Sequence, residues 1–181
     1  MLRLFVAVPI PQAQRQHLGL LAGGVPQARW VPPENHHVTL RFLGDTPEDR
    51  AAEIDEALAA LRAPAFRLGL AGVGHFGGDR AVRILWAGVE GDVQALHFLR
   101  DKVNAALMKA GLPPEGQKFS PHVTLARLRD APLARVRQFL EGNAGFRTAP
   151  FAVDRFVLYR SHLGAGGASY EALAEYPLQA G

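Results

Sequence analysis

Hydrophobic residues recur with two different spacings along this 181-residue chain. Where apolar and polar residues alternate one by one, the pattern predicts a β-strand; where apolar residues return every three or four positions, it predicts an α-helix. Strand-like patterns occupy, in chain order, residues 2–8, 37–43, 66–73, 82–89, 122–128, 151–159 and 170–178. Helical patterns occupy residues 12–21, 47–63, 92–110 and 133–141. Strands that follow one another without an intervening helix favour an α+β protein with mainly antiparallel sheets over a doubly wound parallel sheet.

Several boundaries of these elements carry their own signals. Thr46 is expected to cap the second helix, with Pro47 at its first position and Pro64 beyond its end. The run Gly77-Gly78-Asp79 predicts a turn between two strands. Glycines from Gly164 to Gly167 predict a mobile loop between the last two strands.

One tetrapeptide occurs twice, in matched settings. His37-Val-Thr-Leu recurs as His122-Val-Thr-Leu, each time in a strand-like run that is followed by a helical pattern. Alternation along a strand puts the histidine and the threonine of each copy on one face, and the valine and the leucine on the other. If the two halves of the chain are related by a pseudo-twofold axis, the two polar faces can meet across one cleft.

The side chains of such a cleft suit proton transfer at a phosphate. Histidine gives or takes a proton near neutral pH, so one imidazole can deprotonate water while the other protonates a leaving oxygen. The hydroxyls of Thr39 and Thr124 can bond the phosphate oxygens. No metal is expected, since two histidines leave a zinc site one or two ligands short. The other histidines, among them His36 beside the first motif, lack a threonine two residues on and are expected to be structural or exposed.

Composition narrows the class of protein further. The chain has no cysteine, which excludes disulfides, thiolate metal sites and a cysteine nucleophile, and favours a reducing cytoplasm. Its net charge of +3 is the difference between 20 basic and 17 acidic residues. The basic residues are 17 arginines and three lysines, a bias that suits phosphate recognition and equally suits a compositional preference. The apolar run from Leu4 to Ile10 is too short for a membrane span. No glycine-rich phosphate cradle follows a strand, so no nucleotide cofactor is expected.

Together these segments resemble the 2H phosphoesterase superfamily, specifically the RNA 2′,3′-cyclic phosphodiesterases historically called 2′–5′ RNA ligases. The resemblance rests on Trp30-Val-Pro-Pro-Glu-Asn-His-His-Val-Thr-Leu-Arg-Phe-Leu-Gly44 and on Ser120-Pro-His-Val-Thr-Leu-Ala-Arg127. Phe5-Val-Ala-Val-Pro9 near the start, and Leu158-Tyr-Arg-Ser161 with Gly166-Gly167 and Tyr170 near the end, also fit. The similar segments span nearly the whole chain in order.

The resemblance implies a bilobal, pseudo-twofold α+β fold in which antiparallel sheets line a central cleft and helices lie outside. Residues 1–181 would form one domain of two pseudo-symmetric lobes, each with one motif. By position His37 would be the proton donor to the leaving 3′-oxygen and His122 the proton acceptor from water, giving a 2′-phosphate. Thr39, Thr124 and Arg127 would bind the phosphate. The partner would be RNA with a 2′,3′-cyclic phosphate end, such as a tRNA fragment, bound by a monomer without cofactor or metal.

Some points stay open at this stage. Strict alternation puts Arg127 on the apolar face of its strand unless the strand bends. Phe5, Phe42 and Tyr159 could stack on a base or pack in the core, and Arg41 could contact RNA or solvent. Alternatives are a cyclic phosphodiesterase for a small nucleotide, an RNA-binding module without catalysis, and ATP-independent 2′–5′ ligation.

Overall fold

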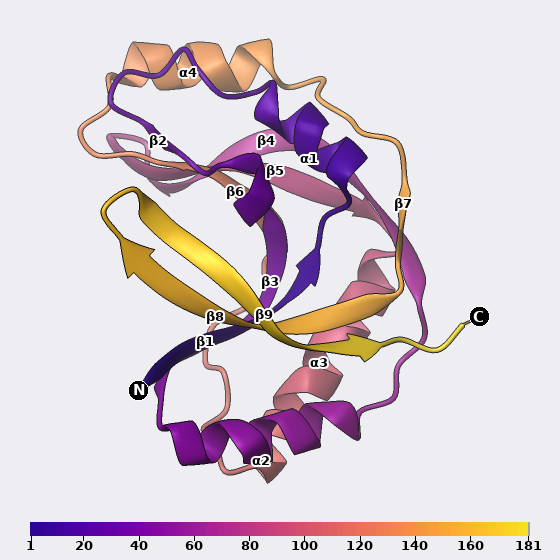
Figure 1. The fold of residues 1–181 in the computed structure, drawn as a ribbon. Helices are drawn as coiled ribbons and strands as arrows, with labels where there is room; N and C mark the ends of the chain where they lie inside the picture. The colour runs from indigo at the N-terminus through magenta and orange to yellow at the C-terminus, as the bar shows by residue number, and fades with distance from the viewer. Residues whose placement is uncertain (181) are drawn as a thin grey trace.

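Two antiparallel sheets form the body of the molecule in the computed structural model, which describes residues 1–180 (Figure 1). The four-stranded sheet has the order β3-β1-β8-β9 and the five-stranded sheet the order β2-β6-β5-β4-β7. The first sheet comprises β1 (Leu2–Pro9), β3 (His37–Thr46), β8 (Arg155–Gly164) and β9 (Gly167–Pro177). The second comprises β2 (Arg29–Trp30), β4 (Phe66–Gly78), β5 (Ala81–Gly91), β6 (His122–Arg127) and β7 (Phe151–Val153). The expected α+β class is confirmed.

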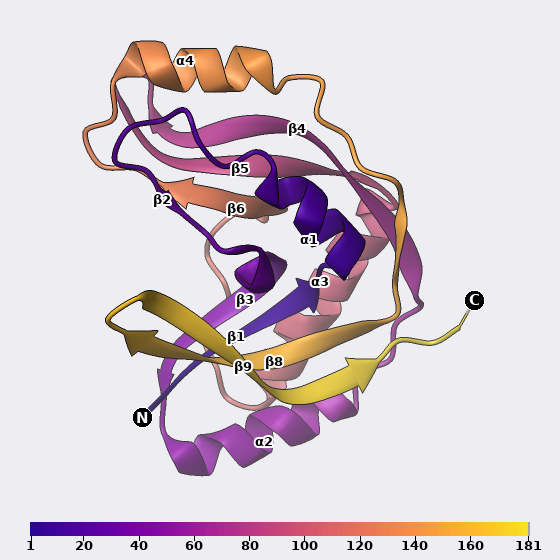
Figure 2. The ribbon, with the colours of Figure 1, turned by 45° about the horizontal axis from the view of Figure 1, so that its top comes forward.

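Helices cover the outer faces of both sheets. They are α1 (Gln12–Gly19), α2 (Glu48–Ala59), α3 (Val93–Lys109) and α4 (Leu133–Gly142), and a short 3-10 helix, η1 (Pro33–Asn35), precedes β3. In both views α4 lies beyond the five-stranded sheet and α2 beyond the four-stranded sheet (Figures 1 and 2). The cleft between the sheets is lined by Asn35 of η1 and by no residue of the four α-helices.

The other two helices, α1 and α3, each contact the sheet that does not contain the strand before them. The side chain of Gln14 on α1 donates to the carbonyl of Ala149, beside β7 of the five-stranded sheet. The side chain of Arg41 on β3 donates to Asn104 Oδ1 on α3, 3.1 Å away. Each sheet is thus contacted by a helix that follows a strand of the other sheet.

Apolar spacing accounts for the packing of these helices. On α3 the fully buried residues are Leu96, Leu99, Val103 and Leu107, which recur every three or four positions. On α2 the buried positions are Ile54 and Leu58, and Asp55 beside them accepts a 2.7 Å hydrogen bond from the Tyr176 hydroxyl of β9.

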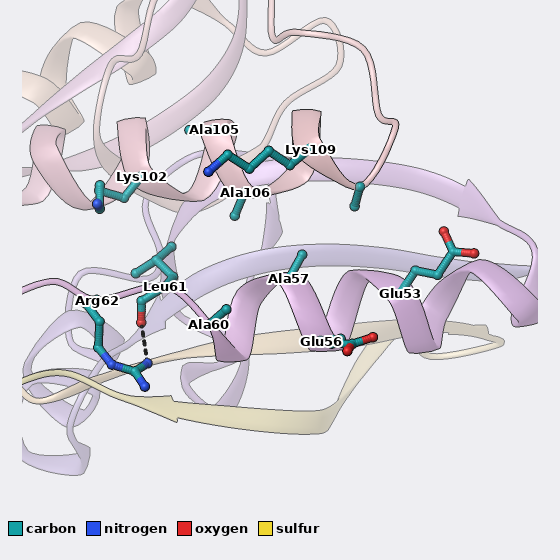
Figure 3. A pocket seen from close by; sticks show the side chains of 11 residues that line it. Glu53, Glu56, Ala57, Ala60, Leu61, Arg62, Lys102, Ala105, Ala106 and Lys109 are labelled. Atoms are coloured by element: carbon teal, nitrogen blue, oxygen red, sulfur yellow. Dashed lines mark hydrogen bonds between the residues drawn. The ribbon is translucent and has the colours of Figure 1, made fainter.

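A surface groove of about 600 Å³ separates α2 from α3 (Figure 3). Its floor is built of small side chains, because alanines from both helices line it. Glu53 and Glu56 stand on one side and Lys102 and Lys109 on the other. No histidine or threonine lines this groove, so neither His-x-Thr motif contributes to it.

Two expected elements differ from the structure. The strand expected at residues 151–159 is two strands: β7 pairs with β4, whereas β8 pairs with β1 and β9 in the other sheet. The alternation breaks at the polar pair Asp154-Arg155, which contains no glycine or proline to mark the end of a strand. The loop expected from Gly164 to Gly167 is a two-residue hairpin turn whose flanking glycines pair across it.

The expected cap at Thr46 is wrong. This residue ends β3 and pairs with Leu2, and its hydroxyl donates to the Gly44 carbonyl at 3.1 Å. The helix starts at Glu48 with Pro47 in the capping position and no side-chain cap, because sheet pairing holds Thr46 back from the helix. None of the helices described is long and apolar enough to cross a membrane.

Candidate active site

Both motif strands contain the same irregularity at the same place. The pairing of β3 with β1 skips Leu40, and the pairing of β6 with β5 skips Leu125, the equivalent residue. Each skipped residue marks a β-bulge, after which the alternation of faces shifts by one position. The first six residues of β3 and all six of β6 accordingly show the same sequence of buried and exposed side chains.

This bulge brings Arg127 to the same face as the histidine of its strand. Leu125 and Ala126 are both buried in succession, and Arg127 then emerges exposed into the cleft. The bend that the sequence left open is therefore present. On β3 the equivalent position holds Phe42, which is 64% exposed and lines the same cleft.

One cleft of about 960 Å³ contains all five residues singled out from the sequence, namely His37, Thr39, His122, Thr124 and Arg127. Behind the two motifs, Val38, Leu40, Val123 and Leu125 are at most 3% exposed. The hairpin turn between β8 and β9 closes one side of the cleft, with Leu163 and Tyr170 among its lining residues. Arg29, Trp30 and Asn35 line another part.

Backbone carbonyls hold the two imidazoles in the same way. His37 Nδ1 lies 2.7 Å from the carbonyl oxygen of Asn35, and His122 Nδ1 lies 2.7 Å from that of Ser120. A carbonyl only accepts, so each Nδ1 carries the proton and each Nε2 is left as the basic nitrogen of the neutral ring. In the first motif the Thr39 hydroxyl lies 2.9 Å from His37 Nε2 and donates to it in that tautomer.

Aromatic rings surround each histidine, but the two sets differ. Phe5 and Tyr170 lie with ring centroids 4.9 Å and 5.3 Å from that of His37. Phe76 meets His122 edge-on at 4.8 Å, and Trp86 lies at 6.5 Å. These rings limit the contact of the imidazoles with water and fix their planes.

Burial lowers the pKa of both histidines. The pKa of His37 is lowered to about 4, chiefly because burial removes water from the charged ring, and the nearby cationic side chains add to this. The pKa of His122 is lowered by burial and by Arg127. The carbonyls of Asn35 and Ser120 oppose these shifts. The lowered pKa favours the neutral form of both rings, and an anion placed between them would favour protonation of one.

Other residues considered from the sequence lie elsewhere. Arg41 is 5% exposed and donates to Asn104 and to the carbonyl of Pro113, so neither alternative considered for it, an RNA contact or solvent, is correct. Phe5 is 3% exposed and stacks on Tyr159 at 5.1 Å, beneath His37. Of the three aromatic residues considered for base stacking, Phe42 is the one that lines the cleft.

Sequence reasoning missed three contributors to the cleft. Asn35 is buried, and its side chain donates to the Ala168 carbonyl of the hairpin at 2.9 Å. Phe76 reaches His122 from β4, a strand that carries no motif. Arg29 lies on β2, a two-residue strand whose pattern is too short to stand out in the sequence. Strand pairing brings Phe76 and Arg29 to the site, whereas Asn35 lies there because it precedes His37 by two residues.

The arrangement can carry out acid–base chemistry on an anion. Two basic imidazole nitrogens, two hydroxyls and a guanidinium line one volume, which suits a phosphate attacked on one side and cleaved on the other. Over the described part of the chain, no group of three or more histidine, aspartate or glutamate side chains is placed to hold a metal ion. The fold and the paired His-x-Thr motifs together suit a phosphoesterase.

Comparison with known proteins narrows this class. Residues 12–165 match the family described as the 2′-5′ RNA ligase superfamily, and the chain belongs to that family. An RNA 2′,3′-cyclic phosphodiesterase of Aeropyrum pernix is 39% identical over 84% of this chain and 86% of its own length. One of Geobacillus stearothermophilus is 36% identical over 96% of this chain, which spans only 56% of that longer relative. A crystal structure of a Thermus thermophilus protein covers 98% of both chains with a TM-score of 0.80 and 28% identity.

Proposed function

We propose that this protein hydrolyses the 2′,3′-cyclic phosphate at the end of an RNA to a 2′-phosphate, with His37 and His122 as the proton carriers. The activity follows from the family and from relatives named RNA 2′,3′-cyclic phosphodiesterase at 39% and 36% identity. The observation that carries the mechanism is the matched hydrogen bond of 2.7 Å from each Nδ1 to a carbonyl. It leaves the Nε2 atom of each ring as the nitrogen that can exchange a proton with the substrate.

In the proposed reaction a water molecule attacks the phosphorus while its proton passes to His122 Nε2. The bond from phosphorus to the 3′-oxygen breaks, and the 3′-oxygen takes the proton from His37 Nε2. The product carries a 2′-phosphate and a 3′-hydroxyl. The assignment of donor and acceptor follows the family resemblance, because the two histidines are held alike. Exchange with solvent afterwards returns the proton from His122 and reloads His37.

The remaining side chains bind the phosphate in this proposal. The hydroxyl of Thr39, which donates to the neutral His37 Nε2, turns to a non-bridging oxygen when the substrate binds and that nitrogen is protonated. Thr124 plays the same part on β6. Arg127 offers a planar fork of donors to the negative charge that grows as water attacks.

The bound end belongs to RNA, such as a tRNA fragment, in our proposal. A 5′-hydroxyl of a second RNA in place of water would give a 2′–5′ linkage by the same step, and dilute conditions favour water. We further propose that residues 1–181 act as a single domain of two pseudo-symmetric lobes, each with one motif, and that the protein is a monomer in the cytoplasm. No metal or cofactor enters any step.

Incubation with an RNA that ends in a 2′,3′-cyclic phosphate tests the activity. The expected product resists a 3′-specific phosphatase and retains its phosphate on the 2′-oxygen. A substrate with sulfur at the 3′ position tests the roles, since a thiolate leaves without a proton. It should largely restore the turnover of His37→Ala but not that of His122→Ala. Restoration of His122→Ala instead would reverse the two assignments, and binding of the RNA without turnover would favour a binding module.

A further inference from the structure

Two arginines face each other across neighbouring strands in the cleft. Arg29 on β2 and Arg127 on β6 are directly paired in the antiparallel register. Both side chains are exposed, and both line the cleft. Like charges directly opposite each other on one face of a sheet are destabilising. Among the ion pairs of residues 1–180, none includes either arginine, so no acidic side chain of the chain offsets this repulsion.

The strand that carries Arg29 is fixed in place by its surroundings. Trp30 pairs with Ala126 and packs against Phe139 of α4, with ring centroids 5.6 Å apart. The backbone of Val31 continues the pairing by donating to the Leu125 carbonyl at 2.8 Å. Arg29 is therefore held beside Arg127 by the packing of the residues after it, not by a contact of its own charge.

This positive wall has no counterpart in the other lobe. β6 is flanked by β2, whereas the equivalent strand β3 is the edge of its sheet. The position equivalent to Arg127 holds Phe42, so one wall of the cleft is cationic and the other aromatic. A substrate with a single phosphate needs one cationic contact. A second guanidinium directly beside the first suits a substrate with a second negative charge close to the first.

We propose that Arg29, together with Arg127, binds a second phosphate of the substrate, the one on the 5′-oxygen of the ribose that carries the cyclic phosphate. The proposal rests on the proposed function and names its substrate class as ribonucleotides with a 5′-phosphate or 5′-phosphodiester. In an RNA chain this is the nearest other negative charge to the reacting phosphorus. Arg127 then lies between the two phosphates, whereas Arg29 contacts only the phosphate on the 5′-oxygen.

Three substrates with the same terminal nucleoside 2′,3′-cyclic phosphate test this subsite. The first has a free 5′-hydroxyl, the second a 5′-phosphate, and the third a second nucleoside joined through the 5′-phosphodiester. In Arg29→Gln, kcat/KM should fall about 10- to 100-fold for the second and third, the range for a lost hydrogen bond to a charged group. It should stay within about twofold for the first. Arg29→Lys should recover part of the loss, since it restores the charge but not the fork.

Salt dependence and a matched variant complete the test. A lost phosphate contact on a single strand lowers the slope of log affinity against log salt by about 0.7, so Arg29→Gln should show this change with a longer single-stranded RNA that ends in the same cyclic phosphate. Arg137→Gln, which removes an exposed arginine of α4 that does not line the cleft, should change neither rate nor slope.

The outcomes separate the inference from the activity on which it depends. If Arg29→Gln affects all three substrates equally, or none of them, or only the dinucleotide, the 5′-phosphate subsite is wrong while hydrolysis stands. If the wild-type protein opens none of the three cyclic phosphates, the proposed function itself fails. Unfolding temperatures equal to that of the wild type exclude a loss of structure as the cause.

Discussion

Asn35 joins His37 to the hairpin that closes the cleft. Its backbone carbonyl accepts the 2.7 Å hydrogen bond from His37 Nδ1, and its side chain donates a 2.9 Å hydrogen bond to the Ala168 carbonyl of β9. The residue is only 9% exposed, so the amide has little access to water as an alternative partner. One residue thus sets both the tautomer of an imidazole and the position of a cleft wall.

We expect Asn35→Leu to lower kcat/KM about 2- to 10-fold, the range for one lost hydrogen bond, and to speed hydrogen exchange of the hairpin residues 163–168. Asn35→Asp also loses the donor, but it adds a negative charge near His37, which favours the imidazolium. Its pH–rate profile should therefore shift to higher pH, unlike that of Asn35→Leu. His162→Gln, which removes the exposed 2.8 Å contact to Glu171 in the same hairpin, is the control. Equal profiles for both Asn35 variants would refute the link to His37.

Gly74 makes room for the ring that lies behind His122. A Cβ at this position would overlap the indole of Trp86, its partner across β4 and β5. Gly74→Ala should displace that ring, destabilise the protein by about 1–3 kcal/mol as overpacking does, and lower kcat. Gly78→Ala lies on the same strand with open space around it and should leave both unchanged. Unfolding by urea measures the stability. A normal kcat in Gly74→Ala would show that the position of the Trp86 ring does not affect catalysis.

The repeat of His-x-Thr makes much of the site predictable from the sequence. Alternation puts the imidazoles and hydroxyls of both motifs on one side and four apolar residues on the other, and the cleft and core follow this division. The pattern works because each motif begins its strand, ahead of any irregularity. Arg127 and Phe42 lie beyond the bulges at Leu125 and Leu40, where strict alternation gives the wrong face.

Other parts of the structure depend on strand pairing, which the spacing of apolar residues along the chain does not reveal. The division between β7 and β8 at Asp154 arises because the two strands have different neighbours, β4 and β1. Arg29 belongs to the cleft only because β2 pairs with β6. The capping signal at Thr46 is misleading for the same reason. Thr46 pairs with Leu2 in the sheet and therefore does not cap the helix that follows.

Chelation should not affect the activity. The groups assigned to the reaction are imidazoles, hydroxyls and a guanidinium, none of which needs a metal for its part. We expect unchanged hydrolysis of a cyclic-phosphate RNA after dialysis against EDTA, and no stimulation by ATP. Recovery of a lost activity by added zinc or manganese would show that the proton carriers have been misassigned.

Arg127→Lys should weaken turnover although it keeps the charge. The guanidinium offers two parallel donors to a phosphate, whereas an ammonium offers a point charge on a flexible stem. Steady-state kinetics should show a larger effect on kcat than on KM if the fork acts on the charge that grows in the transition state. Unchanged kcat and KM would make Arg127 structural. Arg127→Ala is a weaker test, because the guanidinium of Arg29 beside it could take its place.

His37 and His122 must be in different protonation states for the proposed reaction. One imidazole must be neutral and the other protonated, so the rate should follow a bell-shaped pH profile that reports the coupled pair. Because burial lowers the pKa of both rings, that of His37 to about 4, the optimum of kcat/KM should lie below pH 6.5. A bound anion favours the imidazolium, so the optimum of kcat should lie at higher pH than that of kcat/KM.

Alanine in place of either histidine should lower the rate about 10²–10⁴-fold, and the double variant should lose less than the product of the two single losses. His162 is the better control than His36, because His36 is 5% exposed and its pKa is also lowered to about 4 by burial. A bell that persists in His37→Ala or His122→Ala, in protein that remains folded, would place the titrating groups elsewhere.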